Sequence, residues 1–218
     1  MNSVPSTVDD SGKLPRAFYD RPTLDVAGDL IGKVLVHNRR GVRTSGVIVE
    51  VEAYIGESDP ASHAAPGPTR RNAIMYGEAG HAYVYLNYGI HCLVNVVTEG
   101  SQSPAAVLIR ALEPREGIAV MRRRRARAMT GRPAFDGRSW PDSELCRGPG
   151  NLTMAMGITL AENHLDLTGD RLFVEDHGRF DGTLTWSPRI GIRVGTERPW
   201  RVYAAGNPAV SGPRERRT

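Results

Sequence analysis

Two carboxylates and a phenol recur at alternate positions of one stretch of the chain, VIVEVEAYIGESDPASH at 47–63. Alternate side chains of a strand share a face, so Glu50, Glu52 and Tyr54 are expected to project together, about 7 Å from one to the next. Paired carboxylates beside a phenol can carry general acid–base chemistry. Turn residues end this strand and leave His63 on a loop that can fold back over the polar face.

The opposite face of the same strand is uniformly apolar, with Val47, Val49, Val51 and Ala53. This face is expected to be the buried one. A strand with one polar face is also typical of any half-solvated antiparallel sheet, so the stretch alone does not establish a reaction site. The functional interpretation depends on the other motifs of the chain.

A second informative stretch, AYVYLNYGIHCLVNVVT at 82–98, predicts two strands joined by a tight turn. Gly89 is the residue best able to take a positive φ in that turn. Tyr88 stands at the tip and is expected to be exposed at a binding surface. Tyr85 contributes either to packing or to a site, and Asn95, among apolar neighbours, needs a hydrogen-bonding role.

A single arginine interrupts the apolar run AAVLIRAL at 105–112, which predicts a central strand. This residue is Arg110, and a guanidinium in such a setting needs an anionic partner. The interpretation stays open between a structural ion pair with Glu50 or Glu113 and a catalytic partnership with Glu52.

Arginine dominates the basic residues. Lys13 and Lys33 are the only lysines among 28 basic residues, and the net charge is +4. Arginine suits bidentate phosphate recognition, although a genome-wide preference for arginine codons gives the same composition. Arg71 and Asn72 follow a Pro/Gly turn, where they either hold a phosphate, such as that of a nucleic-acid backbone, or are merely solvated. The arginine run at 122–127 is expected to be a solvated helix face or a patch that attracts nucleic acid.

No motif indicates a cofactor or a metal. The chain has no P-loop, no Gly-x-Gly-x-x-Gly after a strand and no histidine pair at metal-ligand spacing. No lysine lies in the motifs, so a Schiff-base mechanism has no obvious nucleophile. Cys92 and Cys146 are expected to be reduced thiols. Without a signal peptide or an apolar run of about 20 residues, a soluble cytoplasmic protein is expected, nucleoid-associated in a bacterium.

The chain is expected to form one domain between two tails. Residues 1–15 predict a disordered tail, 16–210 the folded domain and 211–218 a basic tail. Further elements are expected as helices at 22–31, 113–129, 142–147 and 148–156, a loop at 130–141, and strands at 33–37, 172–175, 184–186, 190–194 and 200–205.

Several separated motifs together resemble one family. They are VEVEAYIGESDPASH, TRRNAIMY, YVYLNYGIHCLVN, VLIRALEP and ELCRGPGNL, in family order and at nearly family spacing between residues 18 and 210. This combination resembles the alkyladenine DNA glycosylases, the monofunctional 3-methyladenine glycosylases of human type. The resemblance implies an α+β fold, a single domain with a curved, largely antiparallel sheet and surrounding helices.

The resemblance also implies a role for each matching residue. Glu52 would activate the hydrolytic water, and Arg110 would help to hold that water and orient the carboxylate. Tyr54 would stack on one face of the extruded base, with His63 and Tyr85 on the other. Tyr88 would be the wedge that enters the duplex. Asn95 would reject normal guanine by a clash with its 2-amino group.

By this resemblance, the chain is expected to flip alkylated or deaminated purines out of double-stranded DNA and hydrolyse the N-glycosidic bond, which initiates base excision repair. It would act as a monomer, without lyase activity. Two alternatives stay open: a non-catalytic damaged-DNA-binding protein, and a carbohydrate glycosidase suggested by Glu50 and Glu52 on one face. The chain departs from the family at residues 90–92, after the wedge and the glycine that follows it, where a methionine and an aromatic or polar residue are more usual.

Overall fold

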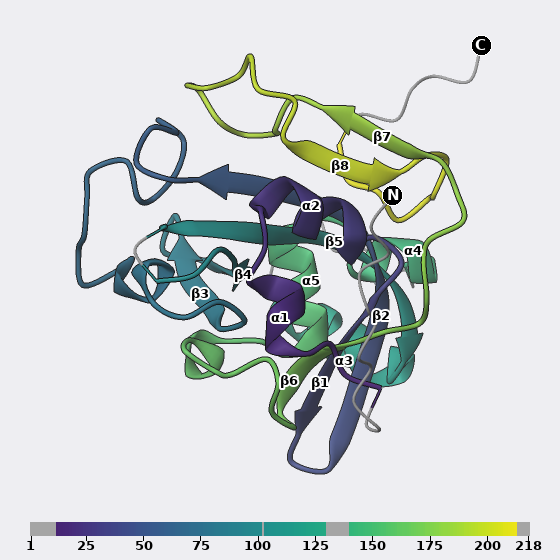
Figure 1. Ribbon diagram of the computed structural model, residues 1–218. Coiled ribbons are helices and arrows are strands. Elements are labelled where there is room, and N and C mark those ends of the chain that lie inside the picture. Colours follow the sequence, from purple (N-terminus) through teal and green to yellow (C-terminus); the bar gives the residue numbers. More distant parts are fainter. Residues whose placement is uncertain (1–11, 102, 130–139, 213–218) are drawn as a thin grey trace.

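Strand β2 (Val42–Ile55) is the centre of the sheet in this computed structural model, which describes residues 12–101, 103–129 and 140–212. The sheet has eight strands, and its main path runs β3-β4-β5-β2-β1-β6 (Figure 1). Every pairing between the described strands is antiparallel. The other strands are β1 (Val34–Arg39), β3 (Ala82–Asn87), β4 (His91–Val97), β5 (Ala105–Glu116), β6 (Leu172–Glu175), β7 (Leu184–Ser187) and β8 (Arg201–Ala204).

The sheet forks along β2. The first half of β2 pairs with β1, whereas Glu50 to Glu52 pair with β8. Strand β7 pairs with β8, so the β7–β8 hairpin lies beside the second half of β2 (Figure 1). Strand β5 pairs with β2 over nearly its whole length. The fork therefore brings β5 and β8 together around the two carboxylates of β2.

Two irregularities in the β2–β5 ladder set the positions of the charged side chains. The register skips Val49 in β2 and then Arg110 in β5. A skipped residue is unpaired and bends its strand, and such bulges are common beside active sites. Glu50, Glu52 and Tyr54 still project together, as predicted, and Arg110 bonds to both carboxylates.

Short helices pack around the sheet. Helix α2 packs against β2 and β5, and α5 packs against β4, β5 and α3. The predicted α+β fold with a curved, largely antiparallel sheet in a single domain is thus confirmed (Figure 1). The helical segments are α1 (Arg16–Tyr19), α2 (Thr23–Leu30), α3 (Ile118–Met129), α4 (Asp142–Leu145), α5 (Pro149–Met156) and the 3-10 turns η1 (Ala73–Tyr76) and η2 (Leu160–Glu162).

The predicted β3–β4 hairpin is present, and its tip is strained. Asn87 pairs with His91, which leaves Tyr88, Gly89 and Ile90 in the turn. Gly89 has φ +68°, as predicted. Tyr88 has φ +48°, a left-handed conformation that costs a non-glycine residue about 1–3 kcal/mol.

Two predicted elements were wrong, each because a longer-range partner decided the conformation. The helix expected from residue 113 starts only at Ile118, since β5 continues to Glu116 in its ladder with β2. The segment 190–194 is not a strand, and the amide of Ile190 donates to the Glu52 carboxylate instead of to a neighbouring strand.

The polar face of β2 is also less open than its alternation suggests. Glu50 and Glu52 are both fully buried. The segment around Ile190 donates to Glu52, and Ser211 donates to Glu50, so residues far along the chain cover this face. The half-solvated strand considered from the sequence is therefore excluded for this stretch.

The described chain extends past both expected limits of the domain. Leu14 is buried, and its amide donates to the Val174 carbonyl at 2.8 Å. At the other end, Ser211 bonds to Glu50. The rest of the predicted tails and most of the predicted loop at 130–141 lie outside the described residues, namely 1–11, 213–218 and 130–139.

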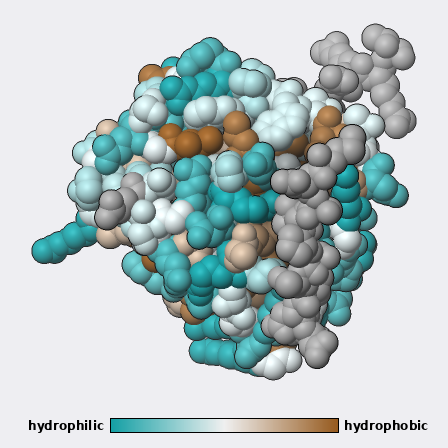
Figure 2. Space-filling view, viewed as in Figure 1, coloured by the Kyte–Doolittle hydropathy of each residue, from teal (hydrophilic) through white to brown (hydrophobic). Residues whose placement is uncertain are grey.

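The face of the molecule in Figure 2 is mostly hydrophilic, with small apolar patches between polar side chains. Within the described ranges, none of the helices has the length and apolar character needed to cross a membrane. In the same part of the chain, no group of three or more His, Cys, Asp or Glu side chains is placed to hold a metal ion.

Candidate active site

A cavity of about 380 Å³ lies between strands β2 to β5 and the loop that follows β7. A volume of this order suits one small planar ring system. Six of the residues predicted for the site line this cavity together: Tyr54, His63, Tyr85, Tyr88, Asn95 and Arg110. Most of the remaining lining side chains are apolar, among them Met75, Leu93 and Leu108.

Glu52 is 0% exposed and is not itself among the lining residues, but three groups that bond to it, from Tyr54, Arg110 and Ile190, belong to residues that line the cavity. Its Oε1 accepts from the amide of Ile190 at 2.7 Å. Its Oε2 accepts from the Tyr54 hydroxyl at 2.8 Å and from Arg110 Nη1 at 3.2 Å. Burial with donors on both oxygens fixes the carboxylate, which can then accept a proton or stabilise nearby positive charge.

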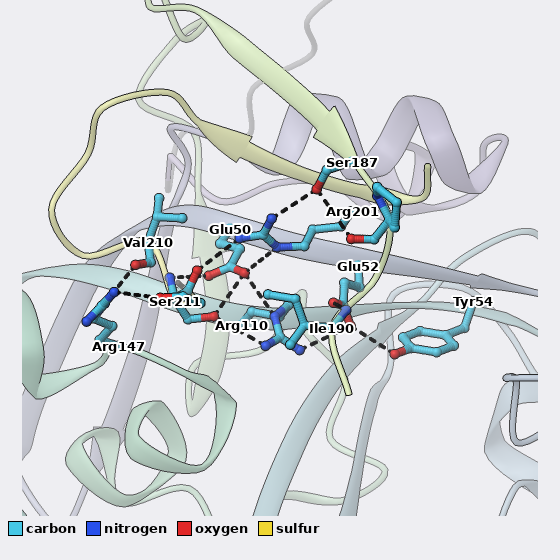
Figure 3. A network of polar contacts seen from close by, with 12 residues as sticks. Glu50, Glu52, Tyr54, Arg110, Arg147, Ser187, Ile190, Arg201, Val210 and Ser211 are labelled. Atoms are coloured by element: carbon cyan, nitrogen blue, oxygen red, sulfur yellow. Dashed lines mark hydrogen bonds and ion pairs between the residues drawn. The ribbon is translucent and has the colours of Figure 1, made fainter. Parts of the chain in front are cut away.

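Arg110 bridges the two carboxylates of β2. Its Nε donates to Glu50 at 3.0 Å and its Nη1 donates to Glu52 at 3.2 Å, so the ion pair considered with Glu50 is present and Glu52 is a second partner. Burial disfavours the charged guanidinium, but Glu52 and Glu50 outweigh this effect and raise the pKa of Arg110. Arg110 therefore remains a cation between Glu50 and Glu52 (Figure 3), and it is one of the residues that line the cavity.

Tyr54 is held between two charged partners. Burial, and then the neighbouring Glu52 carboxylate, raise the pKa of Tyr54 well above its ordinary value, so its hydroxyl stays protonated and donates. The guanidinium of Arg189 lies 4.6 Å from the Tyr54 ring centroid, within cation–π distance. Arg189 is in turn fixed by two bonds to Asp59, at 2.6 and 2.8 Å. No periodic pattern or motif in the sequence points to Arg189.

A histidine and two tyrosines form a second aromatic wall. The rings of His63 and Tyr85 are 4.4 Å apart, centroid to centroid, and His63 Nδ1 lies 2.8 Å from the Tyr83 hydroxyl. Burial and the nearby Arg71 lower the pKa of His63 to about 4. Burial raises the pKa of Tyr85 to about 12. Both rings are thus uncharged at neutral pH.

Asn95 has the hydrogen-bonding role that its apolar surroundings required. Its side-chain nitrogen donates to the Tyr83 carbonyl at 3.0 Å. Tyr83 is also its partner across the β3–β4 ladder. This bond fixes how the Asn95 amide faces the cavity that it lines.

The two residues expected at the DNA backbone differ. Asn72 is 1% exposed, and its side-chain nitrogen donates to the carbonyls of His63 and Gly67 at 2.7 and 2.9 Å. A backbone-contact role for Asn72 is therefore wrong, because its amide holds the His63 loop from inside. Arg71 is exposed, and its guanidinium lies 5.1 Å from the Tyr85 ring centroid, so it stands at the rim of the cavity.

The hairpin tip beside the cavity exposes large apolar side chains. Tyr88 is 85% exposed, and Ile90 in the same turn is 65% exposed. Leu86, one position before the last residue of β3, is 40% exposed. Exposed apolar side chains that lie together are typical of a surface that binds another molecule.

The fold and the cavity together place a fixed carboxylate, Glu52, next to a slot lined by aromatic rings. Comparison with known proteins identifies the family. The family model described as Methylpurine-DNA glycosylase (MPG) matches residues 17–208. The chain therefore belongs to this family of DNA glycosylases, and the resemblance seen in its motifs is confirmed.

Curated relatives agree with this assignment. A protein of Methanocella arvoryzae is 48% identical over 202 residues, which cover 91% of this chain and 95% of that protein. One from Burkholderia lata is 46% identical over 207 residues, 94% of this chain and 93% of its own length. One from Clostridium acetobutylicum is 44% identical over 203 residues, with 91% and 97% covered. All three carry the name "Putative 3-methyladenine DNA glycosylase".

Proposed function

We propose that this chain extrudes alkylated or deaminated purines from double-stranded DNA and hydrolyses their N-glycosidic bond, as a monomer and without lyase activity. Its glycosylase domain would span residues 16–210 together with the flanking residues that contact it. The observation that carries this proposal is the buried Glu52 carboxylate, held on both oxygens beside an aromatic slot.

Recognition of the base would rely on the two aromatic walls of the cavity. Tyr54 would stack on one face of the extruded purine, and His63 with Tyr85 on the other. Aromatic faces attract a cationic ring, and the lowered pKa of His63 keeps that wall neutral, so a positively charged alkylpurine is not repelled. Asn95, fixed through Tyr83, would reject guanine by a clash with its 2-amino group.

Extrusion of the base would depend on the hairpin tip. Taking a base out of the stack costs a few kcal/mol, least for a damaged or mispaired base. An inserted apolar wedge offsets part of that cost. The exposure of Tyr88 and Ile90 supports this role for the tip, with Tyr88 filling the vacated space. Arg71 at the rim would contact the DNA backbone.

Bond cleavage would be hydrolytic. Water attacks C1′ of the sugar, the C1′–N bond breaks, and the purine leaves with the electron pair of that bond. Glu52 would stabilise the positive charge that develops on the sugar and take a proton from the water. Arg110 would help to hold the water and orient Glu52.

Strand cleavage through an imine is not expected. The chain has two lysines, and both pair with aspartates away from the cavity lining, Lys13 with Asp170 and Lys33 with Asp176. An imine would need an amine nucleophile at the site. The products would be a free base and an intact abasic strand.

The test is single-turnover release of hypoxanthine, and in parallel ethenoadenine, from a duplex oligonucleotide, scored by alkaline cleavage. Wild type should release base, and Glu52→Gln should be slower by at least about 1000-fold while it still binds the lesion duplex. Release of either base by Glu52→Gln at the wild-type rate would contradict the proposal. Lesion binding without release by wild type, on these duplexes and on methylated genomic DNA, would identify a damage-binding protein instead.

A further inference from the structure

Glu50, Glu52, Arg110 and Arg201 bond to one another and form a charged network beneath the cavity. A serine from the last described segment completes this network. The Ser211 hydroxyl donates to Glu50 Oε1 at 2.9 Å, and its amide donates to Oε2 at 2.6 Å. The same hydroxyl accepts from Arg110 Nη2 at 3.2 Å. Figure 3 shows Ser211 on the Glu50 side of the network, at the opposite end from Tyr54. One hydroxyl therefore contacts both a buried carboxylate and the arginine that pairs with it.

The backbone around Ser211 is held independently of this hydroxyl. Arg147 donates to the carbonyls of Val210 and Gly212 at 2.8 and 3.0 Å. Arg201 donates to the Ser211 carbonyl at 3.0 Å. Removal of the hydroxyl alone is therefore expected to leave the segment in place.

The three donor groups of Arg110 reach three different acceptors. Nε donates to Glu50 at 3.0 Å, Nη1 to Glu52 at 3.2 Å and Nη2 to the Ser211 hydroxyl. A planar guanidinium held at three points cannot rotate about its long axis. If the Ser211 acceptor is lost, the guanidinium can turn to form a two-point pair with one carboxylate. Such a rotation changes the edge that Arg110 presents to Glu52.

We propose that Ser211 is a positioning residue for base excision, which orients Arg110 both directly and through Glu50. This inference rests on the proposed role of Glu52 as the carboxylate that activates water. Ser211 is not among the residues that line the cavity, so its loss should slow cleavage without weakening recognition of the base. Misplacement of a catalytic group by about 1 Å can cost roughly 100-fold in rate.

Ser187 supplies a matched control. Its hydroxyl accepts from Arg201 Nη1 at 2.9 Å, and Arg201 Nε donates to Glu50 at 2.7 Å, so Ser187 reaches Glu50 only through Arg201. It makes no bond to Glu50 or Arg110 in the described structure. Ser187→Ala therefore removes a similar hydroxyl, whereas Ser211→Ala removes the one that reaches Arg110.

The experiment uses full-length chains and the damaged base that wild type releases fastest from a duplex. Two quantities are measured under single turnover: the rate at saturating enzyme and the enzyme concentration that gives half of that rate. Ser211→Ala should lower the saturating rate by roughly 10- to 100-fold with little change in the half-saturating concentration. Ser211→Thr, which keeps the hydroxyl, should recover most of the rate, and Ser187→Ala should stay within about 2-fold of wild type.

Two results would overturn the inference. One is a saturating rate for Ser211→Ala equal to that of Ser187→Ala. The other is a lower rate for Ser211→Ala together with an equal rise in the half-saturating enzyme concentration and a lower unfolding temperature. That combination would indicate a structural role. Glu52→Gln is measured alongside. Base release by that variant at the wild-type rate would contradict the proposed function itself. An inactive Glu52→Gln with an unaffected Ser211→Ala would contradict only the role of Ser211.

Discussion

The charged network beneath the cavity and the tip of the β3–β4 hairpin are built in opposite ways. In the network, Glu50 and Glu52 are fully buried, and donors from β2, β5, β8 and the segments around Ile190 and Ser211 reach their oxygens. At the tip, Tyr88 and Ile90 stand in water, and Tyr88 adopts a strained backbone conformation. The polar groups of the network are hydrogen-bonded within the chain, whereas the apolar side chains of the tip are left exposed to solvent.

Under the proposed function, this difference assigns the two regions to separate parts of one reaction. Buried charges that are fully bonded keep a fixed geometry, which stabilisation of a transition state requires. Exposed apolar side chains in a strained turn are stabilised when an outside surface covers them. Under the proposed function, the network cleaves the bond and the tip distorts the DNA, and the following substitutions test that division.

The largest effect is expected where the network loses its central cation. Arg110→Met should lower the free energy of unfolding by about 3–5 kcal/mol, because it leaves buried carboxylates without their partner. Urea unfolding measures this. Arg115→Met, an exposed arginine of the same strand, should change stability by about 0.5 kcal/mol or less. An equal change in both variants would show that the network does not depend on Arg110.

A smaller effect is expected when a single donor to Glu52 is removed. Tyr54→Phe keeps the stacking ring but deletes the hydroxyl that donates to Glu52 at 2.8 Å. The saturating rate of base release should fall by about 10-fold, with lesion binding unchanged. The control is Tyr76→Phe, which deletes a hydroxyl bonded to Glu57, an exposed carboxylate. Weaker binding with an unchanged rate would place Tyr54 in recognition alone.

The cavity wall between the two regions should affect selectivity instead of rate. Asn95→Ser should raise the release of normal guanine relative to the damaged base by roughly 10-fold, about 1.4 kcal/mol, because the amide that opposes the 2-amino group is gone. Competition between the two bases in otherwise identical duplexes measures the ratio. An unchanged ratio would exclude Asn95 from guanine rejection.

The smallest effect concerns the pH dependence of stability. The pKa of His63 is about 4 in the folded protein and about 6.5 in a free side chain, so the unfolded chain binds more protons between these values. Stability should therefore fall as the pH drops from about 6.5 toward 4, and His63→Gln should remove about 1 kcal/mol or less of that loss, because the ring is partly solvated. Urea midpoints at pH 7 and pH 5 measure it. An identical loss of stability between pH 7 and pH 5 in wild type and His63→Gln would contradict this prediction.

Local patterns predicted much of the fold and the cavity. Alternation placed Glu50, Glu52 and Tyr54 together, and Gly89 marked the hairpin turn, because strand period and positive φ are properties of neighbouring residues. The family motifs named six residues that line one cavity. What each of them does in the reaction remains a prediction.

Contacts between distant segments could not be predicted in the same way. The bulge at Arg110, the Ile190 amide and the Ser211 hydroxyl depend on which loops meet over β2. The arginine run of α3 is a further case. Arg124 donates to carbonyls at the end of α5, and Arg125 to carbonyls at the end of α4, so both cap helix ends instead of forming a wholly solvated face.

The most direct test of the division between network and tip compares duplex and single-stranded substrates. Single-turnover release of the same damaged base is measured in both contexts for wild type, Glu52→Gln and Tyr88→Ala. Glu52→Gln should lower both rates by the same factor, at least about 1000-fold, whereas Tyr88→Ala should lower the duplex rate by about 10- to 100-fold and largely spare the single strand. Equal losses in both contexts for Tyr88→Ala would contradict a separate role for the tip.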